Sequence, residues 1–351
     1  MTKKCTLKDL AKILNLAVST VSKALNNSPE ISKSTKAKVQ NMALLYNYTP
    51  NKSAQNLKSK RTKTIGVIVP DLLSHFFAMA IHGIETEANS KGYKIIICLS
   101  NDSMEKESES IKTLINGSVD GLIISLSKET QITGEYGHFQ EALKYDFPIV
   151  LFDRTFEQMI CDKISINDQL AAREATEHLL HTGCQNIIFL STIFGTSVGE
   201  KRKMGYMDAL KNKGKHSFIL NIENYNSFEI LLLEQLHKIK VDGIVAADEL
   251  SAISTIKYAL KNSYKIPEDI SVIGFTNGVL AENYVPSLTV VDQQAKEQGT
   301  IAARTLIKRL NKKIPSEPIH LILKTSLIQR QSTHPLLKLK SIDMAPHLPK
   351  V

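Results

Sequence analysis

The sequence predicts an α/β protein whose body forms two lobes, each a doubly wound parallel sheet, behind a small all-α head. Short apolar runs alternate with amphipathic helical patterns from residue 64 onward, which is typical of parallel strands covered by helices on both faces. The string Val-Asp-Gly-Leu-Ile at 119–123 is echoed by Val-Asp-Gly-Ile-Val at 241–245, which indicates two similar lobes. The first 50 residues show three short helical patterns instead.

The positive charge of the chain is concentrated in the head. The 351 residues carry a formal net charge of +9. Residues 1–63 hold 13 Lys and Arg against 2 Asp and Glu, whereas the rest of the chain holds 31 against 33. A block this basic indicates a polyanionic partner, most often nucleic acid, although a solvated basic arm has the same composition.

Composition also bears on compartment and on metal binding. No apolar run has the length and flanks of a signal peptide or of a bilayer span. Cys5, Cys98, Cys161 and Cys184 are far apart and lack the spacing of a metal site. We therefore expect a reduced, cytoplasmic protein that uses no metal and no cofactor.

Three helices are expected in the head. The first begins at a capping box of Thr6 and Asp9, the second covers residues 18–25, and the third runs from the N-cap Ser32 to Tyr46. The residues that face inward at helical spacing are Leu7, Leu10, Ala11, Leu14, Val21, Ala24, Leu25, Val39, Met42, Ala43 and Tyr46. Three such helices with a tight break between the first two describe a helix-turn-helix module, which binds DNA.

Residues 51–63 join the head to the body. A helix this short is marginal in water, yet Ala54 and Leu57 fall on one helical face. The segment is therefore either a plain linker or a helix that folds when a partner covers that face.

The body begins at residue 64. Its expected strands are residues 64–69, 94–99, 121–124, 148–152, 186–190, 243–246 and 271–275, and two of its helices are 76–90 and 168–182. Ligands of doubly wound sheets bind outside the carboxyl ends of the strands. Two such lobes place a small-molecule site in the cleft between them.

The order of residues across the head resembles the LacI-type (lactose-repressor) family of regulators. The matching residues are Thr6-Leu7-Lys8-Asp9-Leu10-Ala11, Ser19-Thr20-Val21-Ser22-Lys23-Ala24-Leu25-Asn26, Ile31-Ser32, Thr35, Lys38-Val39, Tyr46, Tyr48-Thr49-Pro50-Asn51, Ala54, Leu57 and Thr64-Ile65-Gly66. The resemblance continues to about residue 330. It implies a helix-turn-helix domain at 1–50, a hinge at 51–63 and a two-lobed body at 64–332 with the periplasmic-binding-protein fold.

The resemblance also implies roles for residues of the head. The second helix would enter the major groove, with Val18, Ser19 and Lys23 as base readers. The hinge would fold on operator DNA beside its copy, and Leu57 would enter the minor groove as a wedge. The DNA-binding residues expected in total are Thr6, Val18, Ser19, Thr20, Ser22, Lys23, Asn26, Ser32, Ala54, Leu57 and Lys58.

The head departs from the family at three positions. Asn15 stands where many members have Gly, but Asn tolerates the left-handed backbone that the turn needs. Ala17 stands where Ser would cap the second helix. Lys23 replaces Arg and cannot make the planar two-pronged contact with guanine. The operator sequence therefore does not follow from the resemblance.

In the body, the resemblance implies late crossovers. The first lobe would comprise about 64–162 and 292–324, and the second about 163–291 and 325–332. The tail, residues 333–351, contains three prolines and no heptads, so we do not expect a coiled-coil tetramerisation helix.

Polar and aromatic side chains follow successive strands of the body. We expect the effector to contact Phe76, Phe77, Asp153, Arg154, Arg202, Asp248, Thr276 and Gln293. Taken singly, each has a plainer interpretation as a cap, a core residue or a surface charge. Thr276 stands where the family has Asp, so the identity of the effector does not carry over.

Two patterns that resemble enzyme motifs are rejected. Residues 195–201 contain Gly195, Gly199 and Lys201, but their spacing and the residue after the lysine are wrong for a phosphate loop. His178 and His181 lie three residues apart on a helix without a third ligand, so we expect surface residues there. No nucleophile–base arrangement is present, and we expect no enzyme activity.

The sequence thus predicts a DNA-binding transcriptional regulator, most simply a repressor, that acts as a homodimer on a pseudo-palindromic operator. A small effector between the lobes would control it, with a sugar or sugar derivative first and a purine or nucleoside second. The competing class is a cytoplasmic small-molecule-binding protein. Inducer or corepressor action, the operator, the target genes, activation and oligomers beyond the dimer stay open.

Overall fold

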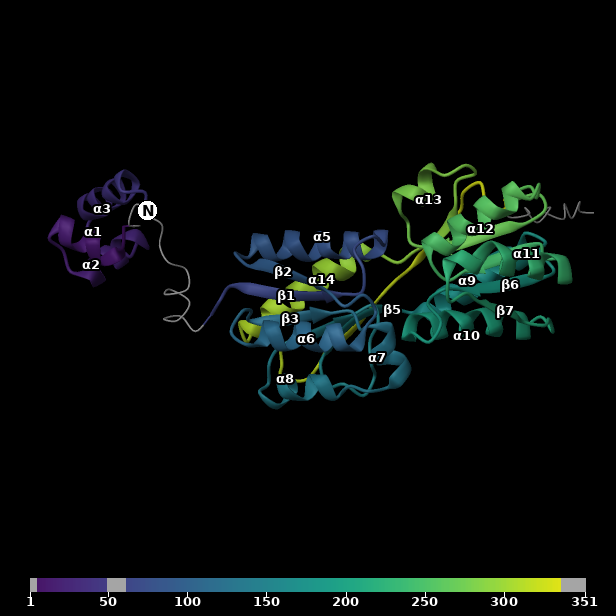
Figure 1. Cartoon of the computed structure of the whole chain (residues 1–351), viewed down its shortest axis with the longest axis horizontal. Coiled ribbons are helices and arrows are strands. Elements are labelled where there is room, and N and C mark those ends of the chain that lie inside the picture. Colours follow the sequence, from purple (N-terminus) through teal and green to yellow (C-terminus); the bar gives the residue numbers. More distant parts are fainter. Residues whose placement is uncertain (1–4, 49–60, 336–351) are drawn as a thin grey trace, which may run out of the picture. The chain divides into compact units, whose positions relative to one another are not determined.

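A computed structural model describes residues 5–48 and 61–335 of the chain (Figure 1). The chain divides between Thr62 and Lys63 into two compact units, a helical head and an α/β body, which are described separately. The predicted hinge contacts Ala54, Leu57 and Lys58 lie outside the described residues, as does the tail from residue 336.

The head consists of the three predicted helices, α1 (Leu7–Leu14), α2 (Val18–Leu25) and α3 (Lys33–Leu45). The capping box at the start of α1 is confirmed, because Asp9 N donates to Thr6 Oγ1 and Thr6 N donates to Asp9 Oδ2. Asn15 adopts the expected left-handed backbone, with φ 51°, and Ala17 provides no side-chain cap. The core consists of Leu10, Ala11, Leu14, Val21, Ala24, Val39 and Ala43.

The prediction for Tyr46 is wrong. Its side chain is 45 % exposed, because α3 ends at Leu45 and Tyr46 serves as the C-cap outside the buried face. Tyr48 packs against the core of the head instead.

The first lobe of the body contains a six-stranded sheet in the order β11-β5-β4-β3-β1-β2. Its neighbouring strands are all parallel. The strands are β1 (Thr64–Val69), β2 (Lys94–Leu99), β3 (Gly121–Ile124), β4 (Ile149–Phe152), β5 (Asp162–Ile166) and β11 (His320–Leu323). Helices α5 (His75–Ser90) and α14 (Ala295–Leu310) cover one face (Figure 1). Helices α6 (Met104–Ile115) and α8 (Gln140–Lys144) cover the other, and α7 (Lys128–Thr133) follows β3.

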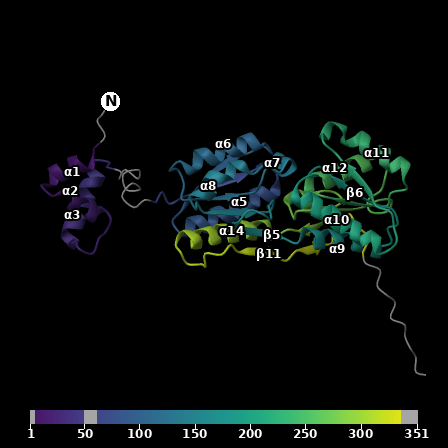
Figure 2. The same ribbon diagram turned by 90° about the horizontal axis from the view of Figure 1, so that it is seen from below.

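The second lobe repeats this plan with the order β12-β10-β9-β8-β6-β7. The strands are β6 (Ile187–Ser191), β7 (Phe218–Asn221), β8 (Gly243–Ala246), β9 (Ser271–Phe275), β10 (Thr289–Asp292) and β12 (Ser326–Ile328), of which β12 alone pairs in the antiparallel sense. Helices α9 (Asp168–His181) and α10 (Ser197–Lys211) cover one face, and α11 (Phe228–Lys238) and α12 (Glu249–Lys261) the other, as Figure 2 also shows. A short helix, α13 (Val279–Asn283), follows β9.

All the strands and both helices expected in the body are confirmed to within about one residue at each end. Strands β5, β7, β10 and β11 were not among the expected ones, and β5 moves the point at which the chain first leaves the first lobe. β5 pairs with β4 through Lys163 and Ile164, so the crossover comes after Ile166 and not at 162. The sequence did not reveal this strand, because it begins with the polar residues Asp162 and Lys163. They are nevertheless buried, because Asp162 accepts from Arg309 Nη2 at 2.5 Å and Lys163 Nζ donates to Glu157 O at 3.0 Å.

The prediction that His178 lies on the surface is also wrong. Its side chain is buried on α9, with 6 % exposure, whereas His181 is exposed. Burial, together with the nearby His181, lowers the pKa of His178. A periodic pattern alone does not show whether a helix is covered on one side or, like α9, also packs against a neighbouring helix, here α10.

The same strand order in both lobes fixes where a ligand can bind. The first strand of each lobe lies between the second and the third, so the chain winds in opposite directions from β1 and from β6. The points of reversal lie between β1 and β3 and between β6 and β8. Side chains at the carboxyl ends of these strands therefore line a crevice.

Helices α14 and α5 pack closely because each has a glycine that faces the backbone of the other, Gly299 on α14 and Gly83 on α5. A Cβ at Gly299 would lie 1.9 Å from Ala80 O, and one at Gly83 would lie 2.1 Å from Lys296 O. Any side chain there would push the helices apart.

Candidate functional site

A cavity of about 410 Å³ opens at the carboxyl ends of both sheets. All eight side chains expected to contact the effector line this one cavity: Phe76, Phe77, Asp153, Arg154, Arg202, Asp248, Thr276 and Gln293. They come from both lobes, because Asp153 follows β4 and Asp248 follows β8. The volume falls within the usual range for small-molecule sites.

Asp153 stands at the end of β4 in a left-handed conformation, with φ 58°. Burial raises the pKa of its carboxyl to about 7, and Asp168 adds repulsion, while Arg202, Arg154 and the Ser125 hydroxyl act in the opposite direction. Its charge is thus stabilised only in part by the groups around it. A polar ligand group that donates to it would complete its surroundings.

Arg154, the next residue, is already paired. Its Nη1 donates to Asp102 Oδ1 at 2.5 Å, and its guanidinium lies 5.8 Å from the centroid of the Phe77 ring. The aromatic ring and the carboxylate fix the guanidinium at the wall of the cavity.

Arg202 on α10 is expected to contact the effector, but two of its three guanidinium nitrogens already donate to the protein. Its Nε donates to Asp168 Oδ1 at 2.8 Å, and its Nη1 donates to Ala247 O at 2.6 Å. Its Nη2 lies 2.7 Å from the same Asp168 oxygen, yet makes no aligned hydrogen bond within residues 61–335. The Nη2 amino group is therefore left to donate to a ligand oxygen. The guanidinium also lies 4.0 Å from the centroid of the Phe275 ring.

Asp248 begins α12 and is held by its own capping box. Its carboxylate accepts from Ser251 N at 2.9 Å and from Thr192 Oγ1 at 2.6 Å. The neighbouring Glu249 is buried, and desolvation together with the Asp248 charge raises its pKa to about 7. This wall of the second lobe is acidic.

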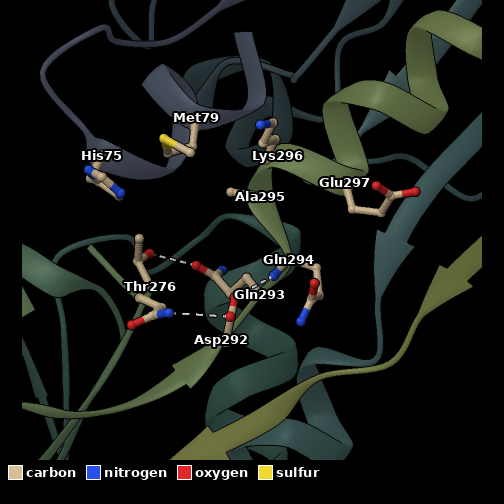
Figure 3. A pocket seen from close by; sticks show the side chains of 10 residues that line it. His75, Met79, Thr276, Asp292, Gln293, Gln294, Ala295, Lys296 and Glu297 are labelled. Carbon is tan, nitrogen blue, oxygen red and sulfur yellow. Dashed lines mark hydrogen bonds between the residues drawn. The ribbon is translucent and has the colours of Figure 1, made fainter. Parts of the chain in front are cut away.

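Thr276 does not present its hydroxyl to the cavity in the way an Asp would present a carboxylate. The hydroxyl donates to Gln293 Oε1 at 2.6 Å, which turns the Gln293 amide nitrogen away from Thr276 (Figure 3). The backbone of Thr276 has φ 83°, which is unusual for a β-branched residue. Thr276 therefore orients Gln293 as the chain passes back to the first lobe.

A second, smaller hollow of about 330 Å³ adjoins this crossover (Figure 3). It shares His75, Thr276 and Gln293 with the cavity, and Lys296 and Glu297 at the start of α14 close its other side. It thus extends the cavity along residues 292–297, where the chain passes from β10 to α14.

Direct hydrogen bonds join the lobes beside the cavity. Gln131 on α7 donates to Ser197 Oγ at 3.0 Å and accepts from Ser197 N at 3.0 Å, so a residue of one lobe caps α10 of the other. Lys128 Nζ donates to Thr192 O at 3.2 Å and lies 3.9 Å from the centroid of the Phe194 ring. These contacts fix the angle between the lobes in this conformation.

Sequence reasoning missed several residues of the cavity. Asp102 follows β2 and Thr192 follows β6, so the strand-end argument could have found both. Glu249 also lines the cavity, at the start of α12. Asp168 does not line the cavity, but the fold reveals it behind the wall as the partner of Arg202.

In the head, α2 exposes the side chains expected to read bases. Val18 is 41 % exposed, and Ser19, Lys23 and Asn26 are also exposed. Lys23 pairs with Glu30. Thr20 and Ser22 are half-buried on α2.

Two further DNA-binding candidates of the head are helix caps. Thr6 caps α1, and Ser32 caps α3 by accepting from Thr35 N at 3.2 Å. Both are exposed at helix N-termini, where backbone N–H groups also face outward, an arrangement suited to phosphate.

Within the described part of the chain, no group of three or more His, Cys, Asp or Glu side chains could hold a metal ion. A search of the same residues finds no helix long and apolar enough to cross a membrane.

Comparison with known proteins assigns the family. The description "Bacterial regulatory proteins, lacI family" matches residues 6–51, and "Periplasmic binding protein-like domain" matches residues 176–333. The ribose operon repressor of Halalkalibacterium halodurans is 30 % identical over 332 residues, covering 93 % of this chain and 97 % of that protein. The transcriptional regulator RegA of Clostridium saccharobutylicum is 31 % identical over 335 residues, covering 93 % and 98 %.

Solved structures agree with the fold. The lac repressor dimer bound to operator and an anti-inducer superposes with a TM-score of 0.83 at 22 % identity, covering 94 % of this chain and 99 % of that chain. A LacI family transcriptional regulator from Enterococcus faecium with bound ribose gives a TM-score of 0.69 at 25 % identity, covering 78 % and 100 %. The chain belongs to the LacI family of bacterial transcriptional regulators.

Proposed function

We propose that this chain is a sequence-specific repressor that binds a pseudo-palindromic operator as a homodimer and is controlled by a small effector between its lobes. The observation that supports this best is the convergence of eight polar and aromatic residues from two lobes on one cavity at the carboxyl ends of the strands. An effector there contacts both lobes and so favours one lobe angle over another.

On DNA, α2 enters the major groove. Lys23 leaves its ion pair with Glu30 and donates to guanine O6 or N7. Val18 contacts a thymine methyl group. Ser19 is the third base reader, while Thr6, Thr20, Ser22, Asn26 and Ser32 bind phosphates. In the hinge, Leu57 acts as a minor-groove wedge beside Ala54, and Lys58 binds a phosphate.

The homodimer is supported by apolar surface on the first lobe. The edge strand β2 exposes Ile96, Ile97 and Leu99 by 40, 38 and 38 %, and Leu73 after β1 is 95 % exposed. An apolar strand left open at a sheet edge favours association, and a second copy of the chain covers it. The lac repressor structure similar to this chain is a dimer on its operator.

The effector is a sugar or sugar derivative, with a purine or nucleoside as the second candidate class. Among the similar proteins, one is named for the ribose operon and another contains bound ribose. Buried donors and acceptors, such as Arg202 Nη2 and the Asp153 carboxylate, suit a ligand rich in hydroxyl groups. The protein acts in the cytoplasm, on the nucleoid.

The test is a thermal-shift screen of the full chain against ribose, cellobiose, sugar phosphates and purines, followed by operator binding with each ligand that raises the melting temperature. A ligand specific to the folded state stabilises it by mass action. A positive ligand that changes operator affinity supports the proposal. If ligands bind but no selected duplex sequence is preferred over random DNA, the chain is a small-molecule-binding protein instead.

A further inference from the structure

Carboxylates outnumber cations on the walls of the cavity. Six acidic residues line it, and the cationic residues among the lining are Arg154 and Arg202. The acidic lining residues are Asp71, Asp102, Asp153, Glu223, Asp248 and Glu249. His75 also lines the cavity, and Lys128 lies behind Asp102 and Glu223.

Both arginines are already matched by a carboxylate. Arg154 pairs with Asp102 at 2.5 Å, and Arg202 pairs with Asp168 at 2.7 Å. Lys128 is turned to the carbonyl of Thr192 and the ring of Phe194. The two arginines thus neutralise Asp102 and Asp168 first and stabilise the Asp153 charge only in part, so the cavity keeps an excess of negative charge.

The excess negative charge is concentrated on the second lobe. Asp248 and Glu249 are adjacent, and neither forms an ion pair with any basic side chain in residues 61–335. Glu249 is 8 % exposed, and its carboxylate receives only a long hydrogen bond of 3.4 Å from Ala281 N. A buried acid so poorly compensated favours either a proton or a cationic ligand group.

Elsewhere in the cavity the protein offers hydrogen-bond donors, which need ligand oxygens and not a cation. Arg202 is 2 % exposed, and its Nη2 lacks an aligned acceptor within the described residues. The Gln293 amide nitrogen is turned away from Thr276 by the hydrogen bond at Gln293 Oε1. Ligand oxygens therefore suit the side near Arg202 and Gln293.

We propose that the effector is an aminated sugar or a similar polyhydroxylated amine, whose ammonium group lies against Asp248 and Glu249 and whose hydroxyls accept from Arg202 Nη2 and the Gln293 amide. This inference rests on the proposed function and narrows its effector class from sugars to cationic sugars. It excludes sugar phosphates and other anionic effectors, because a second negative charge would meet uncompensated carboxylates.

The protonation of Glu249 supplies an independent readout. Its pKa stands at about 7 in the ligand-free cavity, and an ammonium nearby lowers it. Binding of an amine therefore releases a proton, and affinity rises between about pH 6 and about pH 7. Asp153 also has a pKa of about 7 and gives a rise with any ligand that donates to it, so the readout is the part of the rise that Glu249→Gln removes.

The experiment measures calorimetric affinities of the full chain for matched ligands. The probes are D-glucosamine, D-galactosamine and D-mannosamine, each beside its parent hexose, its N-acetyl form and its 6-phosphate. We expect at least one amine to bind roughly ten- to hundredfold more tightly than its neutral parent, as for a hydrogen bond to a charged group.

The variant Glu249→Gln keeps the acceptor for Ala281 N and removes the charge. It should abolish the preference for the amine, so that the amine and its parent sugar bind with similar affinities. The matched control is Glu234→Gln on the exposed face of α11, where the side chain pairs only with Lys238. This control should keep the full preference.

Each outcome decides between the two proposals. Tighter binding of neutral or phosphorylated sugars overturns the amine inference and leaves the sugar-responsive repressor standing. An amine preference that survives in Glu249→Gln also overturns it. Binding of purines with no response to any sugar overturns both the amine and the sugar class, while operator recognition is judged separately.

Discussion

The head and the cleft present their functional side chains in opposite ways. On α2, Val18 is 41 % exposed, and Lys23 pairs with Glu30, only 7 residues away in the chain. In the cleft, Arg202 is 2 % exposed, and its partners Asp168 and Ala247 lie 34 and 45 residues away.

This difference separates two kinds of functional residue. The exposed side chains of α2 contribute little to the folded state, so they can change without unfolding the head. The cleft residues are part of the packing and charge balance of both lobes. Substitutions there should alter stability and effector response together.

The largest expected effect is that of removing the head. Deleting residues 1–63 should abolish operator binding and leave the body folded, because the head has a hydrophobic core of its own. Fluorescence anisotropy with operator DNA and thermal unfolding of the truncated chain measure the two effects. A truncated body that still binds duplex DNA with a steep dependence on salt would overturn the division of labour.

The next effect is that of Arg202→Ala in the body. It strands Asp168, which is 3 % exposed, and should cost about 3–5 kcal/mol of unfolding free energy in urea titrations. The double variant Arg202→Leu with Asp168→Leu should recover much of that stability, since no lone charge remains. Equal losses in the single and double variants would show that the pair itself, not the stranded charge, holds the lobe together.

Asp153→Asn should change how stability depends on pH. The folded-state pKa of about 7 lies above the ordinary 3.8, so the folded state holds a proton that the unfolded state has lost. Wild-type stability therefore falls as pH rises through this window, by on the order of a few kcal/mol, and the variant lacks this fall. Thermal melts at about pH 5 and about pH 8 test it, with the difference between the two chains as the readout.

The smallest effect concerns Lys23→Ala. Because Lys23 and Glu30 are exposed, the stability of the head should hardly change. Operator binding should lose about 1–3 kcal/mol at one base position per half-site. Lys12→Ala on α1 serves as the control. A uniform loss across all operator variants would make Lys23 a phosphate contact.

Whether the sequence predicts a feature depends on the same contrast between partners near in the chain and partners far away. The capping box of Thr6 and Asp9 and the left-handed Asn15 depend on neighbours in the chain, so local rules predicted both. Strand ends were predictable because apolar runs are visible, and those ends placed Asp153 and Asp248 correctly in one cavity.

What escaped prediction depends on distant partners. Strand β5 begins with Asp162, whose burial is compensated by Arg309, 147 residues later. The role of Asp168 depends in the same way on Arg202, and that of Thr276 on Gln293. No window of sequence contains both members of such a pair, so only the three-dimensional fold shows which charge or hydroxyl is already in use.

The close docking of α14 on α5 has a consequence for how the protein is made. Strands β1 to β5 leave the ribosome before the second lobe, but α14 and β11 follow β10. Until Ala302, Ala303 and Leu306 emerge, α5 alone covers this apolar face of the first sheet, and the part under α14 stays open. The second lobe lacks only β12 at that stage, so it can mature first although it is encoded later. A nascent chain stalled before α14 exposes apolar surface of the first sheet, so it is most prone to aggregation and most in need of chaperones at that stage.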